Sequence, residues 1–270
     1  MATKVHFTKE RETLLVTLYG RALQSRSNDP VLKDKWAEDA IGRIDYDFGK
    51  LQMGSIEPLS IAMRAKQFDI WTAEYIATHP DATILHLGCG MDSRAFRLNP
   101  PPSVCWFDVD YPDVIELRTS LYPERPGYRM IGSPLAELGW LDELPRDRPA
   151  MIVAEGVTMY LTEDIIKALL NRLTDHFPSG QIAFDAVNRI AVRMAKISSS
   201  IRATGASFGW GISDAHDIKR LDPKITLVRK LRTPELPGYA KLPWSVRTLV
   251  RTMGTIPTFR RMHRLLLYRF

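Results

Sequence analysis

Short apolar runs alternate with stretches of helical pattern through the middle of the chain, from Ala82 to about Val187. Apolar runs of this length, bounded by turn residues, are typical of strands that are buried on both faces. Five strands are expected, near residues 83–87, 104–109, 128–131, 150–154 and 181–186. Because strands that alternate with helices pair in one direction, the pattern predicts an α/β fold with a parallel sheet.

The chain before this region shows helical patterns and no strand pattern. Three helices are expected, at residues 10–26, 31–48 and 58–78. The stretch Asn28-Asp29-Pro30 separates the first two helices, because proline and turn residues interrupt a helix. We therefore expect residues 1–80 to form an N-terminal helical cap and residues 81–270 to form the core.

Residues 188–223 interrupt the alternation of strands and helices. The segment begins with helical character and continues into the glycine-rich stretch Gly205-Ala206-Ser207-Phe208-Gly209-Trp210-Gly211. We expect an insertion before the sixth strand that covers the functional site. Phe208 and Trp210 either form a mobile wall for a flat apolar substrate or anchor the insertion in the core.

The composition is typical of a globular protein. The 270 residues are 45% apolar, which is ample for one core, and no uninterrupted apolar stretch reaches membrane length. The first residues lack the apolar centre of a signal peptide, so a soluble cytoplasmic protein is expected. Cys89 and Cys105 are the two cysteines, and neither has a metal partner at ligand spacing. We expect no disulfide framework and no metal.

Positive charge is concentrated at the end of the chain, whose formal net charge is +6. Residues 236–270 contain no acid and seven basic residues: Lys241, Arg247, Arg251, Arg260, Arg261, Arg264 and Arg269. Such a segment suits nucleic acid, an acidic membrane surface, an anionic small substrate or simply solvent. The basic residues are spread out and no RNA-binding signature accompanies them, so nucleic acid is disfavoured and no membrane partner is expected.

The clearest candidate for a ligand site follows the first predicted strand. The apolar run of residues 83–87 stops at Gly88-Cys89-Gly90, and a helix is expected soon afterwards. Glycines allow a sharp turn and a close approach to a ligand, while Asp92 or Ser93 can cap the helix. Ligands of doubly wound sheets bind at this end of the strands. The alternative is a tight turn that binds nothing.

Two acids end the second predicted strand, about 20 residues beyond the glycines, which is the spacing of dinucleotide-type sites. They are Asp108 and Asp110, and a carboxylate at this position can accept both hydroxyls of a ribose. Nicotinamide dinucleotides prefer a third glycine, where this chain has Ser93. S-adenosylmethionine (SAM) has no pyrophosphate to bind, so the turn fits SAM better.

Three ordered motifs resemble those of a known family. They are His86-Leu87-Gly88-Cys89-Gly90-Met91-Asp92-Ser93-Arg94, Phe107-Asp108-Val109-Asp110-Tyr111-Pro112-Asp113-Val114-Ile115 and Ala154-Glu155-Gly156-Val157-Thr158-Met159-Tyr160-Leu161. Over nearly its whole length the chain resembles the leucine carboxyl methyltransferase family, in its branch of polyketide-type O-methyltransferases. The resemblance implies the class I SAM-dependent methyltransferase (Rossmann-like) fold. Strands near 225–231 and 264–269 would complete a seven-stranded, mostly parallel sheet whose last strand is antiparallel.

The resemblance also implies which residues bind the cofactor. Residues 88–90 are expected to line the methionine part of SAM, and Asp110 matches the family's ribose-binding acid, with Asp108 as its nearest rival. The remaining contacts are Glu155 and Gly156 near the cofactor, Arg64 on the SAM carboxylate, and Ser133 near the adenine. Ser133 stands in Gly132-Ser133-Pro134-Leu135, where the leucine carboxyl branch has an Asp-Leu pair.

Two further residues are candidates for catalysis. Tyr160 matches a family tyrosine beside the substrate, and its alternative role is core packing with a satisfied hydroxyl. Arg94 falls in the first turn of a predicted helix, where a cation opposes the helix dipole. An acid or a substrate carboxylate should therefore compensate Arg94, and we expect it to take part in the site.

The expected function is O-methylation by SAM, with S-adenosyl-L-homocysteine as product, of a carboxylate or hydroxyl on a small polyketide-like or aromatic metabolite. A carboxylate needs no base, whereas a hydroxyl benefits from one. His216 and His263 remain possible as a base, and neither is assigned. The lack of a convincing base slightly favours a carboxylate.

The alternatives are methylation of a protein or peptide C-terminus, and a non-catalytic SAM-binding or nucleic-acid-associated protein. A homo-oligomer is possible.

Overall fold

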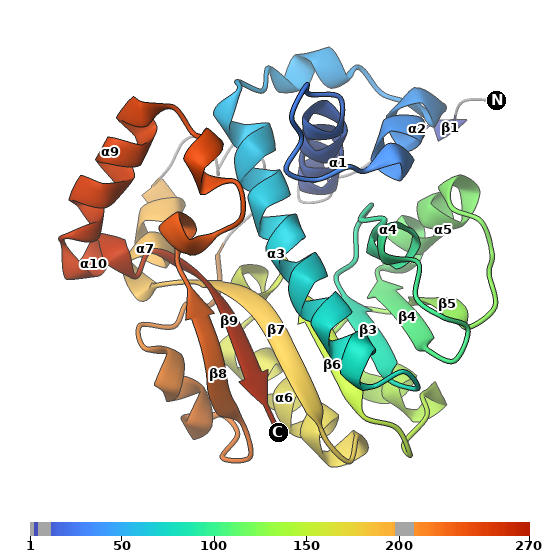
Figure 1. The fold of residues 1–270 in the computed structure, drawn as a ribbon. Coiled ribbons are helices and arrows are strands. Elements are labelled where there is room, and N and C mark those ends of the chain that lie inside the picture. The colour runs from blue at the N-terminus through green and yellow to red at the C-terminus, as the bar shows by residue number, and fades with distance from the viewer. Residues whose placement is uncertain (1–2, 5–11, 198–207) are drawn as a thin grey trace.

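The computed structural model describes residues 3–4, 12–197 and 208–270, and it is built on one seven-stranded sheet (Figure 1). The strands are β3 (Thr83–Leu87), β4 (Cys105–Asp110), β5 (Tyr128–Gly132), β6 (Ala150–Ala154), β7 (Gly180–Val187), β8 (Thr226–Leu231) and β9 (His263–Arg269). They lie in the order β5-β4-β3-β6-β7-β9-β8, and β9 is antiparallel to both of its neighbours. The predicted class I sheet, mostly parallel with an antiparallel last strand, is confirmed.

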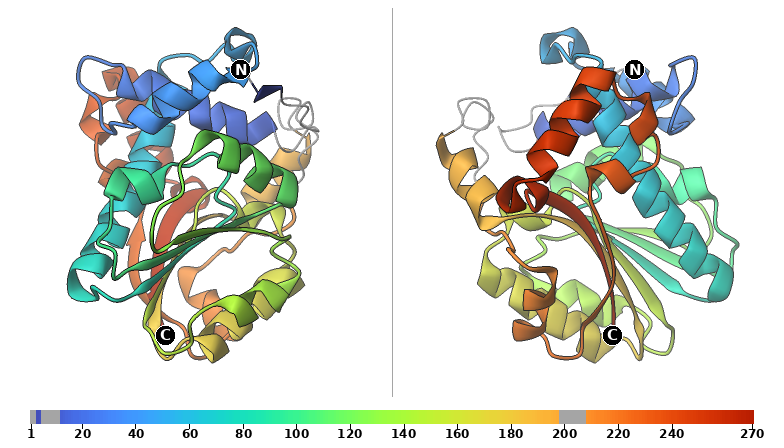
Figure 2. Two further views of the ribbon diagram at one scale, coloured as in Figure 1. Left: turned by 90° about the vertical axis from the view of Figure 1, so that its right-hand side faces the viewer. Right: turned by 60° about the vertical axis from the view of Figure 1, so that its left-hand side comes forward.

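Helices cover both faces of this sheet (Figure 2). The helices are α1 (Glu12–Ser25), α2 (Lys35–Arg43), α3 (Ile56–Thr78), α4 (Arg94–Leu98), α5 (Pro112–Leu121), α6 (Glu163–His176), α7 (Arg189–Ile197), α9 (Trp244–Gly254) and α10 (Pro257–Arg260). On one face Trp71 of α3 belongs to the same apolar cluster as Ile84 of β3. On the other face Leu173 of α6 clusters with Leu85 of β3. Successive residues of β3 thus point into opposite cores, as the strand pleat requires.

Helices α1 and α2 lie beyond the end of the sheet at which β3 finishes, whereas α3 runs along one face of the sheet (Figure 1). Leu15 and Leu18 of α1 are buried in the same apolar cluster as Ile84 and Trp71. The helical cap and one face of the sheet therefore share a hydrophobic core. The division of the chain at residue 80 stays a prediction.

The second expected helix is shorter than its pattern suggested. It begins at Lys35 because the Asp34 carboxylate accepts a hydrogen bond from the N–H of Ala37 at 3.0 Å, which caps the helix. It ends at Arg43, since Ile44 is extended and Ile44–Asp45 (β2) pairs with Thr3–Lys4 (β1). Short 3₁₀ helices occur at Phe48–Leu51, Leu138–Glu143, Thr158–Tyr160, Ala215–Arg220, Thr233–Glu235 and Tyr239–Lys241.

The two connections before β8 and β9 differ in how well they were predicted. The expected insertion 188–223 contains α7 and a 3₁₀ helix, and its residues 198–207, which include the first part of the glycine-rich stretch, lie outside the described part of the chain. The connection from β8 to β9 contains α9 and α10, which the sequence pattern did not predict. Both connections approach the start of β9, because the N–H of Asn188 donates to the carbonyl oxygen of Met262 at 3.1 Å. Within the described ranges, the helices are all too short or too polar to cross a membrane.

Candidate active site

The glycine turn after β3 has the backbone geometry that the sequence predicted. Gly88 and Gly90 have φ values of +59° and +48°, in the left-handed region where a side chain is strained. A Cβ on Gly88 would lie 2.5 Å from Cγ2 of Val157. The turn thus requires glycine at residue 88 both for its φ and for the close approach of the loop that follows β6.

The helix after this turn is not capped as expected. Ser93 is in the N-cap position of α4, but its side chain makes no cap hydrogen bond. Its hydroxyl instead donates to Asp34 Oδ1 at 2.5 Å. The Asp92 carboxylate lies 3.1 Å from Nη2 of Arg94 and 3.0 Å from Nη1 of Arg97. The capping prediction is therefore wrong, because buried ion pairs and hydrogen bonds engage both side chains.

The structure gives the two acids of β4, Asp110 and Asp108, different surroundings. Asp110 is half-buried, and its Oδ2 accepts a hydrogen bond from the N–H of Gly90 at 2.7 Å. Burial raises the pKa of Asp110, although two backbone N–H groups oppose this effect. The carboxylate thus stands at the glycine turn, where a ribose-binding acid is required.

Asp108 has different surroundings. It is fully buried and accepts hydrogen bonds from the Tyr128 hydroxyl at 2.6 Å and from Nε1 of Trp106 at 2.8 Å. Burial acts to raise its pKa, but the paired Arg118 guanidinium outweighs burial and lowers the pKa to about 2. These contacts make Asp108 a buried structural carboxylate and favour Asp110 as the cofactor residue.

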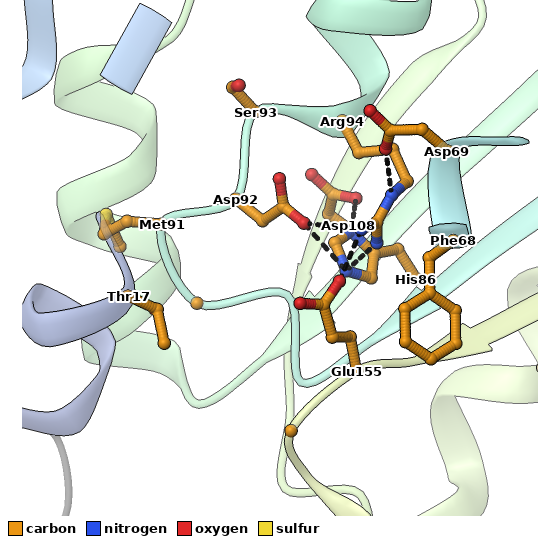
Figure 3. Close-up of polar contacts among 12 residues, drawn as sticks. Thr17, Phe68, Asp69, His86, Met91, Asp92, Ser93, Arg94, Asp108 and Glu155 are labelled. Atoms are coloured by element: carbon orange, nitrogen blue, oxygen red, sulfur yellow. Dashed lines mark hydrogen bonds and ion pairs between the residues drawn. The ribbon is translucent and has the colours of Figure 1, made fainter. Parts of the chain in front are cut away.

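Arg94 is the centre of a buried group of charges (Figure 3). Its side chain is fully buried, and its Nε lies 2.8 Å from Asp69 Oδ1. Its Nη2 lies 2.5 Å from Glu155 Oε2, and Nη1 donates to Nε2 of His86 at 3.2 Å. The acid that was expected to compensate this cation is therefore present. These contacts orient Glu155 at the end of β6, and a catalytic part for Arg94 stays a prediction.

A second arginine contacts the other oxygen of Glu155. Nε of Arg64, on α3, lies 2.9 Å from Glu155 Oε1, and Nη1 lies 3.1 Å from Asp185 Oδ2. The other oxygen of Asp185 accepts a hydrogen bond from the N–H of Gly156 at 2.6 Å. Gly156 has φ +71°, and a Cβ there would lie 3.3 Å from the Arg64 guanidinium. The structure thus brings Arg64, Glu155 and Gly156 together beside the glycine turn.

Comparison with known proteins agrees with this geometry. The sequence profile of the leucine carboxyl methyltransferase family matches residues 14–174. The chain belongs to the leucine carboxyl methyltransferase family. TcmP, the tetracenomycin polyketide synthesis O-methyltransferase of Streptomyces glaucescens, is 44% identical over 270 residues, with 100% of each chain covered. The S-adenosyl-L-methionine-dependent methyltransferase dpfgK of Gibberella zeae is 34% identical over 260 residues, which are 88% of this chain and 87% of that protein.

A solved structure shows the same fold. A DUF574 family protein from Streptomyces avermitilis superposes with a TM-score of 0.58 at 15% identity, over 97% of this chain and 99% of that chain. Taken with the two relatives, the findings show that this chain is a SAM-dependent O-methyltransferase.

Two other predicted cofactor residues of this methyltransferase lie on the same edge of the sheet. Cys89 is buried within the turn, and burial raises the pKa of its thiol well above the usual value. Ser133 follows β5, and its N–H donates to the carbonyl oxygen of Asp110 at 2.8 Å. The Ser133 hydroxyl donates to the carbonyl oxygen of Pro134 at 3.3 Å. Ser133 therefore lies beside Asp110 in space, on the side of the site at which β5 ends.

The two aromatic residues of the insertion have different surroundings. Trp210 is 4% exposed and packs 6.2 Å from the Phe184 ring in the core on the α6 face, so of its two expected roles the structure supports the core anchor and not the mobile wall. Phe208 contacts Tyr160 edge to face, at 5.5 Å between ring centroids. Tyr160 is 39% exposed, which disagrees with its alternative reading as a core residue. The rings of Tyr160 and Phe208 remain candidates for contact with the methyl acceptor of this methyltransferase.

Sequence reasoning missed several charged residues of the site. Asp69 on α3 lies 2.7 Å from Nε of Arg97, and Asp185 lies in the middle of the apolar strand β7. His263, which the sequence analysis had named as a possible base, lies with its Nε2 3.1 Å from Asp185 Oδ2. The signal that could have revealed Asp185 is an acid flanked by apolar residues within a buried strand, which is costly unless it is paired.

Proposed function

We propose that this methyltransferase transfers the methyl group of SAM to a carboxylate or hydroxyl oxygen of a small polyketide-like or aromatic metabolite. The observation that carries the proposal is the hydrogen bond from Gly90 to Asp110, which places a carboxylate beside a glycine turn at the end of β3. The activities for which two relatives are named, one of them in polyketide synthesis, support the choice of reaction and acceptor.

The described residues carry the groups that SAM would contact. Residues 88–90 would approach its methionine part, Asp110 would accept the ribose hydroxyls, and Ser133 lies on the side where adenine would follow. The Arg64 guanidinium would pair with the carboxylate of the methionine part of SAM, and the Glu155 carboxylate would pair with its ammonium group. We assign no metal to the reaction, and S-adenosyl-L-homocysteine is the expected product.

The chemistry asks the protein mainly for positioning. When bound, SAM supplies an electrophilic methyl group, so the chain must hold an oxygen in line with it and exclude water. Tyr160 and Phe208 form an aromatic contact that would suit one face of a flat acceptor. An in-line oxygen held in this way needs no covalent contribution from the enzyme.

The proposal is tested by methyl transfer from isotopically labelled SAM to a panel of acceptors. The panel pairs 1-naphthol and 2-naphthol with 1-naphthoic acid and 2-naphthoic acid, and adds a peptide that ends in leucine. Transfer to any of the small aromatic compounds supports the proposal. The peptide is included because the family is described as leucine carboxyl methyltransferases, and transfer to the peptide alone would replace the small-metabolite proposal.

Calorimetry with SAM measures cofactor binding independently of the acceptor. A chain that binds SAM and methylates nothing in the panel would count against the proposed class of acceptor. A cytoplasmic location and a homo-oligomeric state stay predictions, and size-exclusion chromatography with light scattering tests the second.

A further inference from the structure

Three successive backbone carbonyl oxygens, at the end of the glycine turn, accept hydrogen bonds from buried side chains. Nη1 of Arg118, on α5, donates to the carbonyl oxygens of Gly90 at 2.7 Å and of Asp92 at 2.9 Å. The carbonyl oxygen of Met91, between them, accepts a hydrogen bond from the Tyr122 hydroxyl at 2.9 Å. We propose that Arg118 and Tyr122 are positioning residues of the proposed cofactor site, which hold the turn in the conformation that binds SAM. The inference rests on the proposed function.

Gly90 is held on both of its polar groups by side chains from different elements. Its N–H donates to Asp110 Oδ2 on β4, and its carbonyl oxygen accepts from Arg118 on α5. Because glycine has more backbone freedom than any other residue, these two contacts restrict a residue whose φ is +48°. Loss of the bond to Arg118 would free the Gly90 carbonyl to rotate, and the hydrogen bond to Asp110 would weaken with it.

Asp108, the other acid of β4, holds the arginine in place. Its Oδ2 pairs with Nη2 of Arg118, and both side chains are fully buried. The Tyr128 hydroxyl accepts from the same Nη2 at 3.0 Å and donates to Asp108 at 2.6 Å. Burial acts to lower the pKa of Arg118, but Asp108 outweighs burial and raises the pKa, so the side chain is a cation. The two acids of β4 therefore act on the same glycine, Asp110 directly and Asp108 through Arg118.

Tyr122 contacts both the arginine and the turn. The guanidinium carbon of Arg118 lies 4.9 Å from the centre of the Tyr122 ring, which is a cation–π contact. The carbonyl oxygen of Met91, to which the Tyr122 hydroxyl donates, also accepts from Nη2 of Arg21, on α1, at 2.7 Å. Side chains from α1 and α5 thus meet at the same backbone carbonyl. Loss of the Tyr122 hydroxyl should have a smaller effect than loss of the Arg118 guanidinium, because Arg21 keeps one bond to Met91.

A merely structural arginine would stabilise the fold and leave the SAM affinity of the folded protein unchanged. The chain offers a matched residue for this comparison. Arg264 is 2% exposed, and its guanidinium donates to the two carbonyl oxygens of residues 212–213, as Arg118 does at the turn. Tyr268 is also fully buried, and its hydroxyl donates to the carbonyl oxygen of Ala215 at 2.8 Å. Within the described ranges, neither side chain hydrogen-bonds a residue that we assign to SAM.

The test compares Arg118→Lys with Arg264→Lys. A lysine keeps a positive charge beside Asp108 but lacks the planar fork that reaches both the carboxylate and the two carbonyl oxygens. Isothermal titration calorimetry should show that SAM affinity falls by about 10-fold or more in Arg118→Lys, because hydrogen bonds to a charged group are lost. Arg264→Lys should bind SAM as the unchanged enzyme does, although thermal unfolding should show that both variants lose stability. Unchanged SAM affinity in folded Arg118→Lys would overturn the proposal.

A milder pair of variants decides the matter even where Arg118→Lys does not fold. Tyr122→Phe removes one hydroxyl and keeps the ring, and Tyr268→Phe does the same on the other face of the sheet. SAM affinity should fall by about 3-fold in Tyr122→Phe, which is the effect of one ordinary hydrogen bond, and should not change in Tyr268→Phe. Equal SAM affinities in the two tyrosine variants would overturn the proposal.

Methyl transfer gives a second readout that a merely structural role would not move. With an acceptor that the enzyme methylates, the KM for SAM should rise in Arg118→Lys while kcat at saturating SAM changes little, because the turn contacts the donor before and during transfer. A lowered kcat with an unchanged KM for SAM would contradict the proposal. Absence of SAM binding in the unchanged enzyme would overturn the proposed function and this inference with it. Binding that both variants leave unaltered would overturn this inference alone.

Discussion

Asp110 Oδ2 accepts a hydrogen bond from the N–H of Gly90 at 2.7 Å, so the acid that ends β4 is joined directly to the glycine turn after β3. The two residues come from different strands, and their neighbours Leu87 and Val109 are paired in the parallel ladder. The register of β3 and β4 therefore places the carboxylate of Asp110 next to the glycine turn, which is the arrangement that the proposed ribose contact requires.

Asp110→Ala should weaken SAM binding by about 10- to 100-fold, because hydrogen bonds to a charged group contribute about 1.5–3 kcal/mol. Isothermal titration calorimetry measures this change. Asp142→Ala is the matched control, since Asp142 is exposed and pairs only with Arg146 and Arg172. Equal SAM affinity in both variants would remove Asp110 from the ribose site and return the role to Asp108.

Gly88→Ala should destabilise the fold by roughly 2 kcal/mol or more, because a side chain is strained at φ +59° and its Cβ would lie 2.5 Å from Val157. Thermal unfolding measures the loss. Gly42→Ala, in α2, is the control: no atom lies within 4 Å of its added Cβ, so a stabilisation of about 0.5–1 kcal/mol is expected. Similar melting temperatures for the two variants would contradict the close packing of the turn.

Arg94→Met should cost about 3–5 kcal/mol in the free energy of unfolding, because it leaves Asp69 and Glu155 buried without their shared cation. SAM binding should also weaken, since Glu155 loses one of the two arginines that orient it. Urea denaturation measures the stability. Arg146→Met, which breaks an exposed ion pair, should change it by less than about 1 kcal/mol. A loss for Arg94→Met no larger than this would show that the buried charges are not coupled.

The stability of the protein should fall as the pH falls from about 4 towards 2. The folded-state pKa values of Asp108 and Asp185 are about 2, below the ordinary 3.8, so the unfolded chain takes up protons first in this range. Each carboxylate should contribute about 2 kcal/mol above pH 4, and this contribution is lost as the pH falls through 2.

The raised pKa of Asp110 acts in the opposite direction, so the measured slope is a balance of these groups. Urea denaturation between pH 6 and pH 2.5 gives this slope, and Asp142→Asn, on the surface, should leave it unaltered. A free energy of unfolding that does not change over this range would contradict the lowered pKa values of the two buried acids.

Features of the fold that depend on residues close together in the sequence were predictable from the sequence. The strand pattern predicted five strands of the sheet to within two residues, and the family resemblance implied the other two. The glycines, with their acid about 20 residues later, indicated the candidate cofactor site. Helix α2 was predicted too long although its capping residue, Asp34, is visible in the sequence. Trp210 was open to two interpretations, because only the packing against Phe184 shows on which side of the sheet it lies.

The charged contacts of the site were not predictable in the same way. Arg64 and Asp185 are 121 residues apart, and Asp185 and His263 are 78 apart, yet each pair is within 3.1 Å. No local pattern relates such residues. The motifs quoted from the sequence covered Arg94 and Glu155, but the pairing of their side chains became visible only in the tertiary structure, where Arg94 Nη2 contacts Glu155 Oε2.

By itself the sequence determined most of the strands and helices, the position of the glycine turn and the choice of SAM, because periodicity, backbone freedom and spacing act along the chain. Only the tertiary structure decided which acid faces the turn, which acids pair with Arg64 and Arg94, and that His263 meets Asp185. The physical reason is that these contacts depend on strand order and direction, which bring the start of the antiparallel β9 to the edge where the parallel strands end.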